Sequence, residues 1–253
     1  MKSIASASRN AAARLAVMNA TNRVIGLIGG MSWVSTAHYY ETLNTGVATQ
    51  LGGDHCARLV LWQTDFDTIT NLQRAGRWDE AGEVLAEGAR SLVAAGAELV
   101  AILANTMHLV ASQVVAAASP VPLVHIVEAV RDECLRRGIT KLGLLGTGYT
   151  MESPDLFPSI LTPAGIELLI PNAKDRAEIQ RHTFDELILN RVTPEATSRF
   201  TSASEDMIER GAQAIVLACT EHGMVLKDGD LSVPVLDSTA IHVRAILAAA
   251  LNT

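Results

Sequence analysis

Aromatic residues make up only 4% of the 253-residue sequence, and acidic residues outnumber basic ones, giving a formal net charge of −7. A surface with this charge repels a phosphate backbone, and the small number of aromatic rings offers little stacking area for bases. We therefore expect no nucleic-acid partner. No apolar run approaches the roughly 20 residues of a membrane span. Runs such as Leu99–Leu103 have the length of buried strands instead, so we also expect no membrane partner.

Cysteine is scarce as well, with Cys56, Cys134 and Cys219 as its three occurrences. An odd number at wide spacing fits neither a disulfide framework nor a zinc site. No group of His, Cys and Asp residues has the spacing of metal ligands, so we expect no metal. We predict a reducing, cytoplasmic compartment in which a free thiol can take part in chemistry.

The first 21 residues lack acidic side chains and are rich in Arg, Ser and Ala. They contain no continuous apolar segment, so they do not resemble a secretory signal. We predict an N-terminal extension over residues 1–21, with a transit peptide as the alternative.

Short apolar segments alternate with segments of helical periodicity along the rest of the chain, which predicts an α/β fold with buried, mostly parallel strands. We predict strands at Val24–Ile28, Leu59–Gln63, Leu99–Leu103, Leu123–Ile126, Lys141–Leu145, Ala214–Ala218 and Val233–Leu236. We predict helices at Ser35–Gln50, Trp78–Ala95, His108–Ala118, Val127–Arg137, Asp175–Asn190, Pro194–Arg210 and Ser238–Ala250.

Three segments of the first half recur in the second in the same order, which indicates an internal duplication. They are Ile25–Gly29 with Leu142–Gly146, Gly96–Glu98 with Gly211–Gln213, and Val121–Val124 with Val233–Leu236. We predict two pseudo-symmetric α/β domains, one of residues 22–126 with 236–253 and the other of residues 127–235. The active site is expected in the cleft between them.

Ligands of parallel α/β sheets bind beyond the carboxyl ends of the strands, so the motifs that follow the strands should converge. The middle repeat has no gaps, and it places Ala104–Thr106 opposite Cys219–Glu221, residue by residue. A thiol between a strand end and a helix start lies near free backbone N–H groups, which lower its pKa. Cys219 could then accept and return a proton. A buried, inert cysteine is the alternative interpretation.

The segments IGLIGGMSWVST, ANTMHLV, LLGTGYTME, ACTEHGMV and VPVLDSTAIH resemble the aspartate/glutamate racemase family, in its branch of broad-specificity amino-acid racemases. The resemblance is collinear from about Arg23 to the end of the chain. It implies two pseudo-symmetric domains, no cofactor, a small amino-acid substrate, frequent homodimers and a two-base mechanism. In that mechanism one residue on each side of the substrate Cα removes or delivers the proton.

The resemblance makes Cys219 the second acid/base and puts Ala104 at the position of the first, where a methyl group cannot accept a proton. It also implies that Glu221 orients the thiol or meets the substrate ammonium. We expect His108 and His222 to be structural or pocket-wall groups, with assistance in proton transfer as the alternative. The residues that match the family's substrate-binding positions are Met31, Ser32, Gln63, Asn105, Thr106, Thr147, Thr220 and Glu221. Three interpretations stay open: a racemase impaired at Ala104, a one-thiol decarboxylase or lyase of the same superfamily, and an inactive amino-acid binder.

Overall fold

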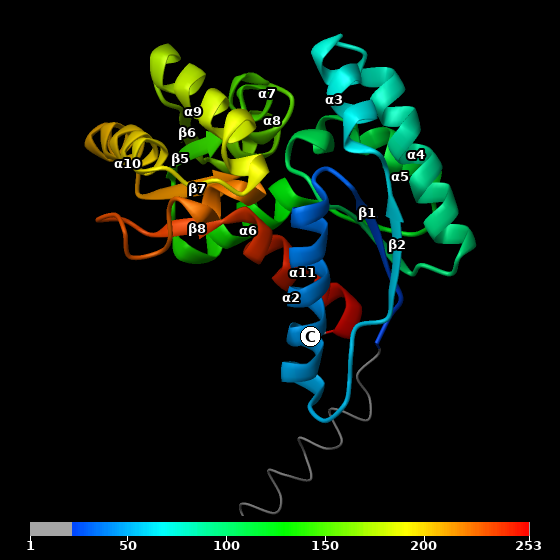
Figure 1. Ribbon diagram of the computed structural model, residues 1–253. Coiled ribbons are helices and arrows are strands. Elements are labelled where there is room, and N and C mark those ends of the chain that lie inside the picture. The colour runs from blue at the N-terminus through cyan, green and yellow to red at the C-terminus, as the bar shows by residue number, and fades with distance from the viewer. Residues whose placement is uncertain (1–21, 253) are drawn as a thin grey trace, which may run out of the picture.

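The structure, a computed structural model, describes residues 22–252 and contains two parallel four-stranded sheets. Figure 1 shows them in two lobes, with β1 and β2 in one lobe and β5 to β8 in the other. The predicted α/β class is therefore confirmed. The predicted extension over residues 1–21 lies outside the described residues. None of the helices between residues 22 and 252 has the length and apolar character needed to cross a bilayer.

The two sheets have the same topology, β2-β1-β3-β4 in the first half and β6-β5-β7-β8 in the second. In the first sheet Ile25 lies opposite Leu99, and in the second Leu142 lies opposite Ala214. These are the residues that the sequence repeat equates, so the repeated segments occupy equivalent places. The strands are β1 Ile25–Gly29, β2 Leu59–Gln63, β3 Leu99–Ile102, β4 Leu123–Val124, β5 Lys141–Gly146, β6 Glu167–Leu169, β7 Ala214–Ala218 and β8 Val235–Asp237.

Helices connect the parallel strands, and their ends follow local capping chemistry. Ser32 caps the first of them through its hydroxyl, and Gly138 ends another in the left-handed conformation that glycine adopts without strain. The α-helices are α2 Trp33–Leu51, α3 Phe66–Arg74, α4 Trp78–Ala94, α5 Ala111–Ala118, α6 Ile126–Arg137, α7 Gly148–Glu152, α8 Phe157–Leu161, α9 Ala173–Asp185, α10 Pro194–Glu209 and α11 Ser238–Leu251. The 3-10 helices are η1 Thr106–Val110, η2 Thr162–Ala164, η3 Leu187–Leu189 and η4 Thr220–Met224.

The sequence did not predict α3, α7, α8 or β6, which are short or rich in polar residues. The helix predicted from His108 starts instead as the 3-10 helix η1 and becomes α-helical at Ala111. The last strand starts two residues later than predicted, at Val235, because Pro234 has no N–H group to donate to a neighbouring strand.

Three apolar clusters form the core, two of them beside the first sheet and the largest around the second. The last helix, α11, contributes Val243, Ile246 and Leu247 to a cluster of the first sheet, although it follows the last strand of the second. This packing supports the predicted division into residues 22–126 with 236–253 and residues 127–235, which stays a prediction.

Three histidines, of which His108 and His242 are buried and His125 is half-buried, gather where the chain passes from one half to the other. The ring centroid of His108 lies 4.5 Å from that of His125 and 5.9 Å from that of His242. His108 Nδ1 bonds the carbonyl of Ala104 at 2.8 Å, and its Nε2 accepts from the amide of Ile126 at 3.2 Å. Burial lowers the pKa of His125 and of His242 to about 4 each, and lowers the pKa of His108 well below its usual range. All three rings are therefore neutral at pH 7.

We predict that acid destabilises the fold through these rings. Their folded-state pKa values lie below the unfolded value of roughly 6.5, so the stability they contribute is complete above that pH and is lost as the pH falls toward 4. Each unit of lowered pKa corresponds to about 1.4 kcal/mol. Thermal unfolding followed by circular dichroism should show Tm falling steeply between pH 6.5 and 4. His242→Gln should flatten this slope, whereas His38→Gln, at an exposed site on α2, should not. An unchanged slope in His242→Gln would contradict the prediction.

Candidate functional site

Equivalent loops of the two halves meet at one pocket. β3 is followed by Ala104, and β7 is followed by Cys219, so both residues stand where the repeat predicted them, just beyond the carboxyl ends of equivalent strands. Ala104 and Cys219 line the same cavity, which has a volume of about 60 Å³. This is several times the space that one water molecule requires, so the pocket suits a small ligand.

The carboxylate of Glu221 joins the two halves next to the thiol. Its Oε1 accepts a hydrogen bond from Ser32 Oγ at 2.9 Å, and Ser32 is the N-cap of α2 in the first half. Its Oε2 accepts from Cys219 Sγ at 3.1 Å and from Thr220 Oγ1 at 2.6 Å. Three donors therefore fix this buried carboxylate, and the carboxylate in turn fixes the direction of the thiol proton.

The thiol of Cys219 is held in its protonated form. Burial raises its pKa well above the usual range, and the negative charge of Glu221 raises it further. The backbone amides of Glu221 and Thr220 lower it, as the sequence predicted, but by less. The predicted lowered pKa is therefore wrong: the side chain is only partly exposed, and lost hydration with a neighbouring anion outweighs two amide dipoles.

Three threonine hydroxyls form a second contact between the halves. Thr106 Oγ1, from η1, lies 3.1 Å from Thr147 Oγ1 and 2.9 Å from Thr150 Oγ1. Thr147 is the N-cap of α7 and lies 3.2 Å from Thr150 through its hydroxyl. Each hydroxyl can both donate and accept, so the cluster can turn donors toward an anionic group in the pocket.

Asn105 offers an acceptor to the pocket. Its Nδ2 donates to Ser238 Oγ at 3.0 Å, and Ser238 in turn donates to the carbonyl of Leu217 at 2.7 Å. Because the serine proton is used on Leu217, the asparagine must present its NH₂ group to Ser238, which fixes the amide orientation. Among the described residues, Oδ1 of Asn105 is buried without a hydrogen-bond partner. A buried acceptor of this kind requires a donor, such as the ammonium group of a ligand.

Most of the residues predicted for the site lie in it, and Gln63 does not. Met31, Asn105, Thr106, Thr147, Thr220 and Glu221 line the pocket. Ser32 lies behind Glu221, to which it donates. Gln63 is exposed at the end of the edge strand β2, with its side chain next to Gly30, so the structure does not place it against the ligand space.

Several lining residues were not predicted, because most of them come from segments outside the motifs, while Met107, Tyr149 and Ala218 lie within the motifs but were not assigned to the site. They are Phe66, Gln73, Met107, Tyr149, Thr183, Phe184, Ile188 and Ala218. The helix α3 could have been found from Asp65, which caps it through its side chain, and from the helical spacing of buried Ile69 and Gln73. The contribution of α9 could not have been predicted, because no local sequence pattern indicates that this helix reaches the pocket.

The two histidines near the motifs support the walls. His108 holds the carbonyl of Ala104, as described above. His222 is fully buried, with Nε2 3.0 Å from Thr183 Oγ1 and its ring 4.6 Å from that of Phe200, and it does not line the pocket. Within residues 22–252, no group of three or more His, Cys, Asp or Glu side chains is arranged to hold a metal ion.

A family model, described as Asp/Glu/Hydantoin racemase, matches residues 28–246. The match begins near the end of β1 and includes all the motifs that follow the strands. The chain belongs to this family. It is 25% identical over 227 residues to the broad specificity amino-acid racemase RacX of Bacillus subtilis, covering 86% of this chain and 93% of that protein.

Two crystal structures extend the match. A Yersinia pestis protein, provisionally assigned as an Asp/Glu racemase, is 39% identical with a TM-score of 0.85 over 90% of this chain and 99% of that one. An aspartate racemase homologue from Pyrococcus horikoshii OT3 is 32% identical with a TM-score of 0.78, again over 90% of this chain and 99% of that one. The resemblance seen in the sequence motifs is confirmed. For this member of the racemase family, membership and relatives together support an amino-acid racemase.

We predict that Glu221 controls the ionisation of the thiol in this racemase-family protein. Glu221→Gln removes the negative charge beside the sulfur, so the pKa of Cys219 should fall. The measurement is the pH midpoint of Cys219 alkylation by iodoacetamide, followed by peptide mass spectrometry. Glu209→Gln, at an exposed site at the end of α10, is the matched control and should leave the midpoint unchanged. A midpoint that stays the same in Glu221→Gln would show that the carboxylate does not act on the thiol.

Proposed function

We propose that the protein is a cofactor-independent amino-acid racemase of the aspartate/glutamate type in which one of the two bases is missing. Cys219 exchanges the proton on one face of the substrate Cα, and Ala104 leaves the opposite face without an acid or a base. The observation that carries the proposal is that Ala104 and Cys219, equivalent in the two halves, line one pocket.

The pocket residues fit the two polar groups of an amino acid. The ammonium group can donate to the unpartnered Oδ1 of Asn105 and to the carboxylate of Glu221. The α-carboxylate can accept from the hydroxyls of Thr106, Thr147 and Thr220, which line the same space. Cα then stands between the two strand ends, within reach of the thiol.

The proton steps follow from the contact between Cys219 and Glu221. The thiol proton moves to the carboxylate along the 3.1 Å hydrogen bond, and the resulting thiolate removes the proton from Cα. The electron pair of the broken C–H bond passes into the α-carboxylate, where the threonine hydroxyls stabilise it. Since the methyl group of Ala104 carries no acidic proton, the thiol first exchanges its proton with solvent, and Cys219 then reprotonates the carbanion on the face from which the proton left. The expected result is exchange with retention of configuration.

A one-sided lyase is the second candidate function, and the raised pKa of Cys219 favours it. A thiol that is protonated at rest is ready to donate. Loss of carbon dioxide from a malonate-type substrate leaves a carbanion that needs one proton on one face, which Cys219 alone can deliver. Release of carbon dioxide from an aminomalonate would support this candidate, whereas exchange with retention supports the first. Tight amino-acid binding without either reaction would support the binding-protein interpretation.

We expect Cα proton exchange without racemisation. In heavy water, one enantiomer of a substrate amino acid should gain deuterium, and its conversion to the other enantiomer should be slower by about 10²–10⁴, the usual value of a positioned acid/base group. Mass spectrometry after chiral separation measures both rates. Cys219→Ala should abolish exchange, whereas Cys56→Ala, at an exposed cysteine, should leave it intact.

The complementary variants restore the missing group. Ala104→Cys or Ala104→Thr should raise racemisation with little change in exchange. If the unmodified chain racemises as fast as it exchanges, a second group acts at the first position. Loss of racemisation in Tyr149→Phe would then identify that group as the phenol that lines the pocket. Either result would overturn the one-base proposal.

We also propose a cytoplasmic homodimer. Cys56, Cys134 and Cys219 are all free thiols, as suits a reducing compartment. Large apolar side chains are exposed on α2 and on the edge strand β2, with Trp33 68%, Tyr40 57% and Leu61 47% exposed, which supports a contact between two copies. Light scattering coupled to gel filtration should give the mass of two chains, and the mass of one chain would contradict the dimer.

A further inference from the structure

The pocket contains almost no charge. Among the described residues that line it, none is Lys, Arg or His, and Glu221 is the one carboxylate. Aspartate and glutamate each bring a second carboxylate on the side chain. Burying that group requires a guanidinium, an ammonium or several converging donors.

The part of the wall left after the polar groups are assigned is mostly apolar. Its apolar members are Met31, Phe66, Met107, Phe184 and Ile188. Its main polar member is Gln73, which is buried and donates from Nε2 to the sulfur of Met107 at 3.1 Å. A substrate side chain in this region exchanges water for carbon and sulfur atoms, which favours an apolar group and penalises a charged one.

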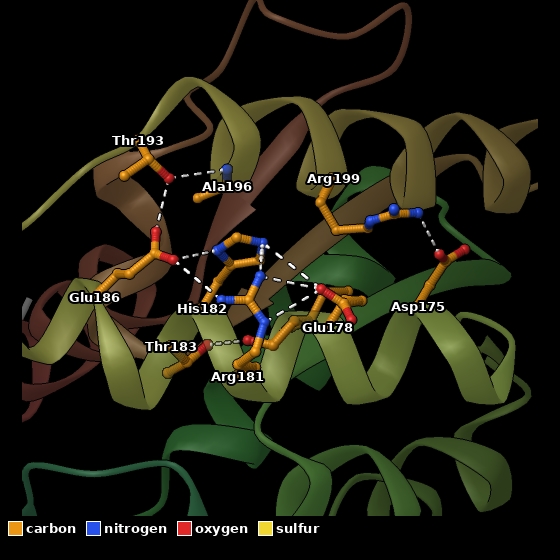
Figure 2. A network of polar contacts seen from close by, with 10 residues as sticks. Asp175, Glu178, Arg181, His182, Thr183, Glu186, Thr193, Ala196 and Arg199 are labelled. Carbon is orange, nitrogen blue, oxygen red and sulfur yellow. Dashed lines mark hydrogen bonds and ion pairs between the residues drawn. The ribbon is translucent and has the colours of Figure 1, made fainter.

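The nearby cations are occupied elsewhere or lie outside the pocket. Arg181 stands on α9 close to Thr183, but Figure 2 shows its guanidinium among carboxylates, 3.0 Å from Glu178 and 3.3 Å from Glu186. Arg74 is exposed and lines the neighbouring cavity that Gln73 also borders.

Arg176 is bound in the same way, and it borders a different cavity. It contacts Glu152 at 2.7 Å and the carbonyl of Pro171 at 2.8 Å. Arg74 forms no ion pair with a carboxylate among residues 22–252, unlike Arg176 and Arg181, so it is the cation that the test must address.

The carboxylate of Glu221 would also repel a carboxylate on the substrate side chain. The Glu221 carboxylate lies beside the reacting thiol, and its two oxygens already accept three hydrogen bonds. A side-chain carboxylate brought into the same small cavity would face it across a space of low polarity.

We infer that the substrate is an α-amino acid with an uncharged, mainly apolar side chain, in preference to aspartate or glutamate. The inference rests on the proposed function, since it names the substrate of the same site. It concerns the wall made by α3, η1, α9 and η3, whereas the proton chemistry concerns Cys219 and Glu221.

The test compares amino acids of equal shape and different charge. Cα deuterium exchange is measured in the unmodified protein for asparagine against aspartate and for glutamine against glutamate, with methionine as the apolar member and lysine as the cationic one. The kcat/KM for exchange should be higher for the amide of each pair by about tenfold or more, high for methionine and low for lysine. Equal or faster exchange of aspartate, glutamate or lysine would overturn the inference.

Two variants and one control test whether the wall around Gln73 sets the preference against a charged side chain. Gln73→Arg introduces a cation into the wall and should shift the preference toward aspartate or glutamate. Gln180→Arg introduces the same charge in the two neighbouring cavities and should not. Arg74→Gln should leave the ratio of asparagine to aspartate unchanged, and a selective loss of aspartate exchange would show that Arg74 enters the pocket and that the inference is wrong.

Binding by calorimetry separates this inference from the proposed function. If no amino acid exchanges but asparagine and methionine bind more tightly than aspartate, the proton chemistry is wrong and the substrate class stands. If aspartate exchanges as well as asparagine, the substrate class is wrong and the proton chemistry stands.

Discussion

The carboxylate of Glu221 is the group on which the site depends. It accepts hydrogen bonds from Ser32 of the first half and from Cys219 and Thr220 of the second, so a single carboxylate orients the thiol and links the two halves. The same charge raises the pKa of the thiol that it orients. The resting state is therefore a protonated acid next to its own proton acceptor, and proton transfer between the two needs no movement of the backbone.

The internal duplication explains how the fold accommodates an alanine at the position where the proposed mechanism lacks a base. Ala104 and Cys219 occupy equivalent positions after β3 and β7, and both positions are set by strand pairing and by the buried strands themselves. A methyl group packs against the apolar cluster at the first position without any polar partner. The symmetry of the backbone is thus retained although the two equivalent side chains differ, because packing depends on the shape of a side chain and not on its acid/base chemistry.

The proposed chemistry and the inferred substrate preference involve different parts of the chain. The thiol, its carboxylate and the threonine hydroxyls belong to the repeated strand-end motifs. The wall that meets the substrate side chain comes largely from α3 and α9, through residues such as Phe66, Gln73 and Phe184.

The sequence by itself determined the α/β class, the repeat, and the placement of Ala104 opposite Cys219, because strand periodicity and a gapless repeat fix which residues follow equivalent strands. The tertiary structure alone decided that Gln63 does not line the pocket and that Phe184, on a helix far along the chain, does. It also decided the direction of the Cys219 pKa shift. The pKa of a side chain depends on its burial and on its distances from charged groups. The local sequence gives neither the burial of the Cys219 sulfur nor the position of the Glu221 carboxylate.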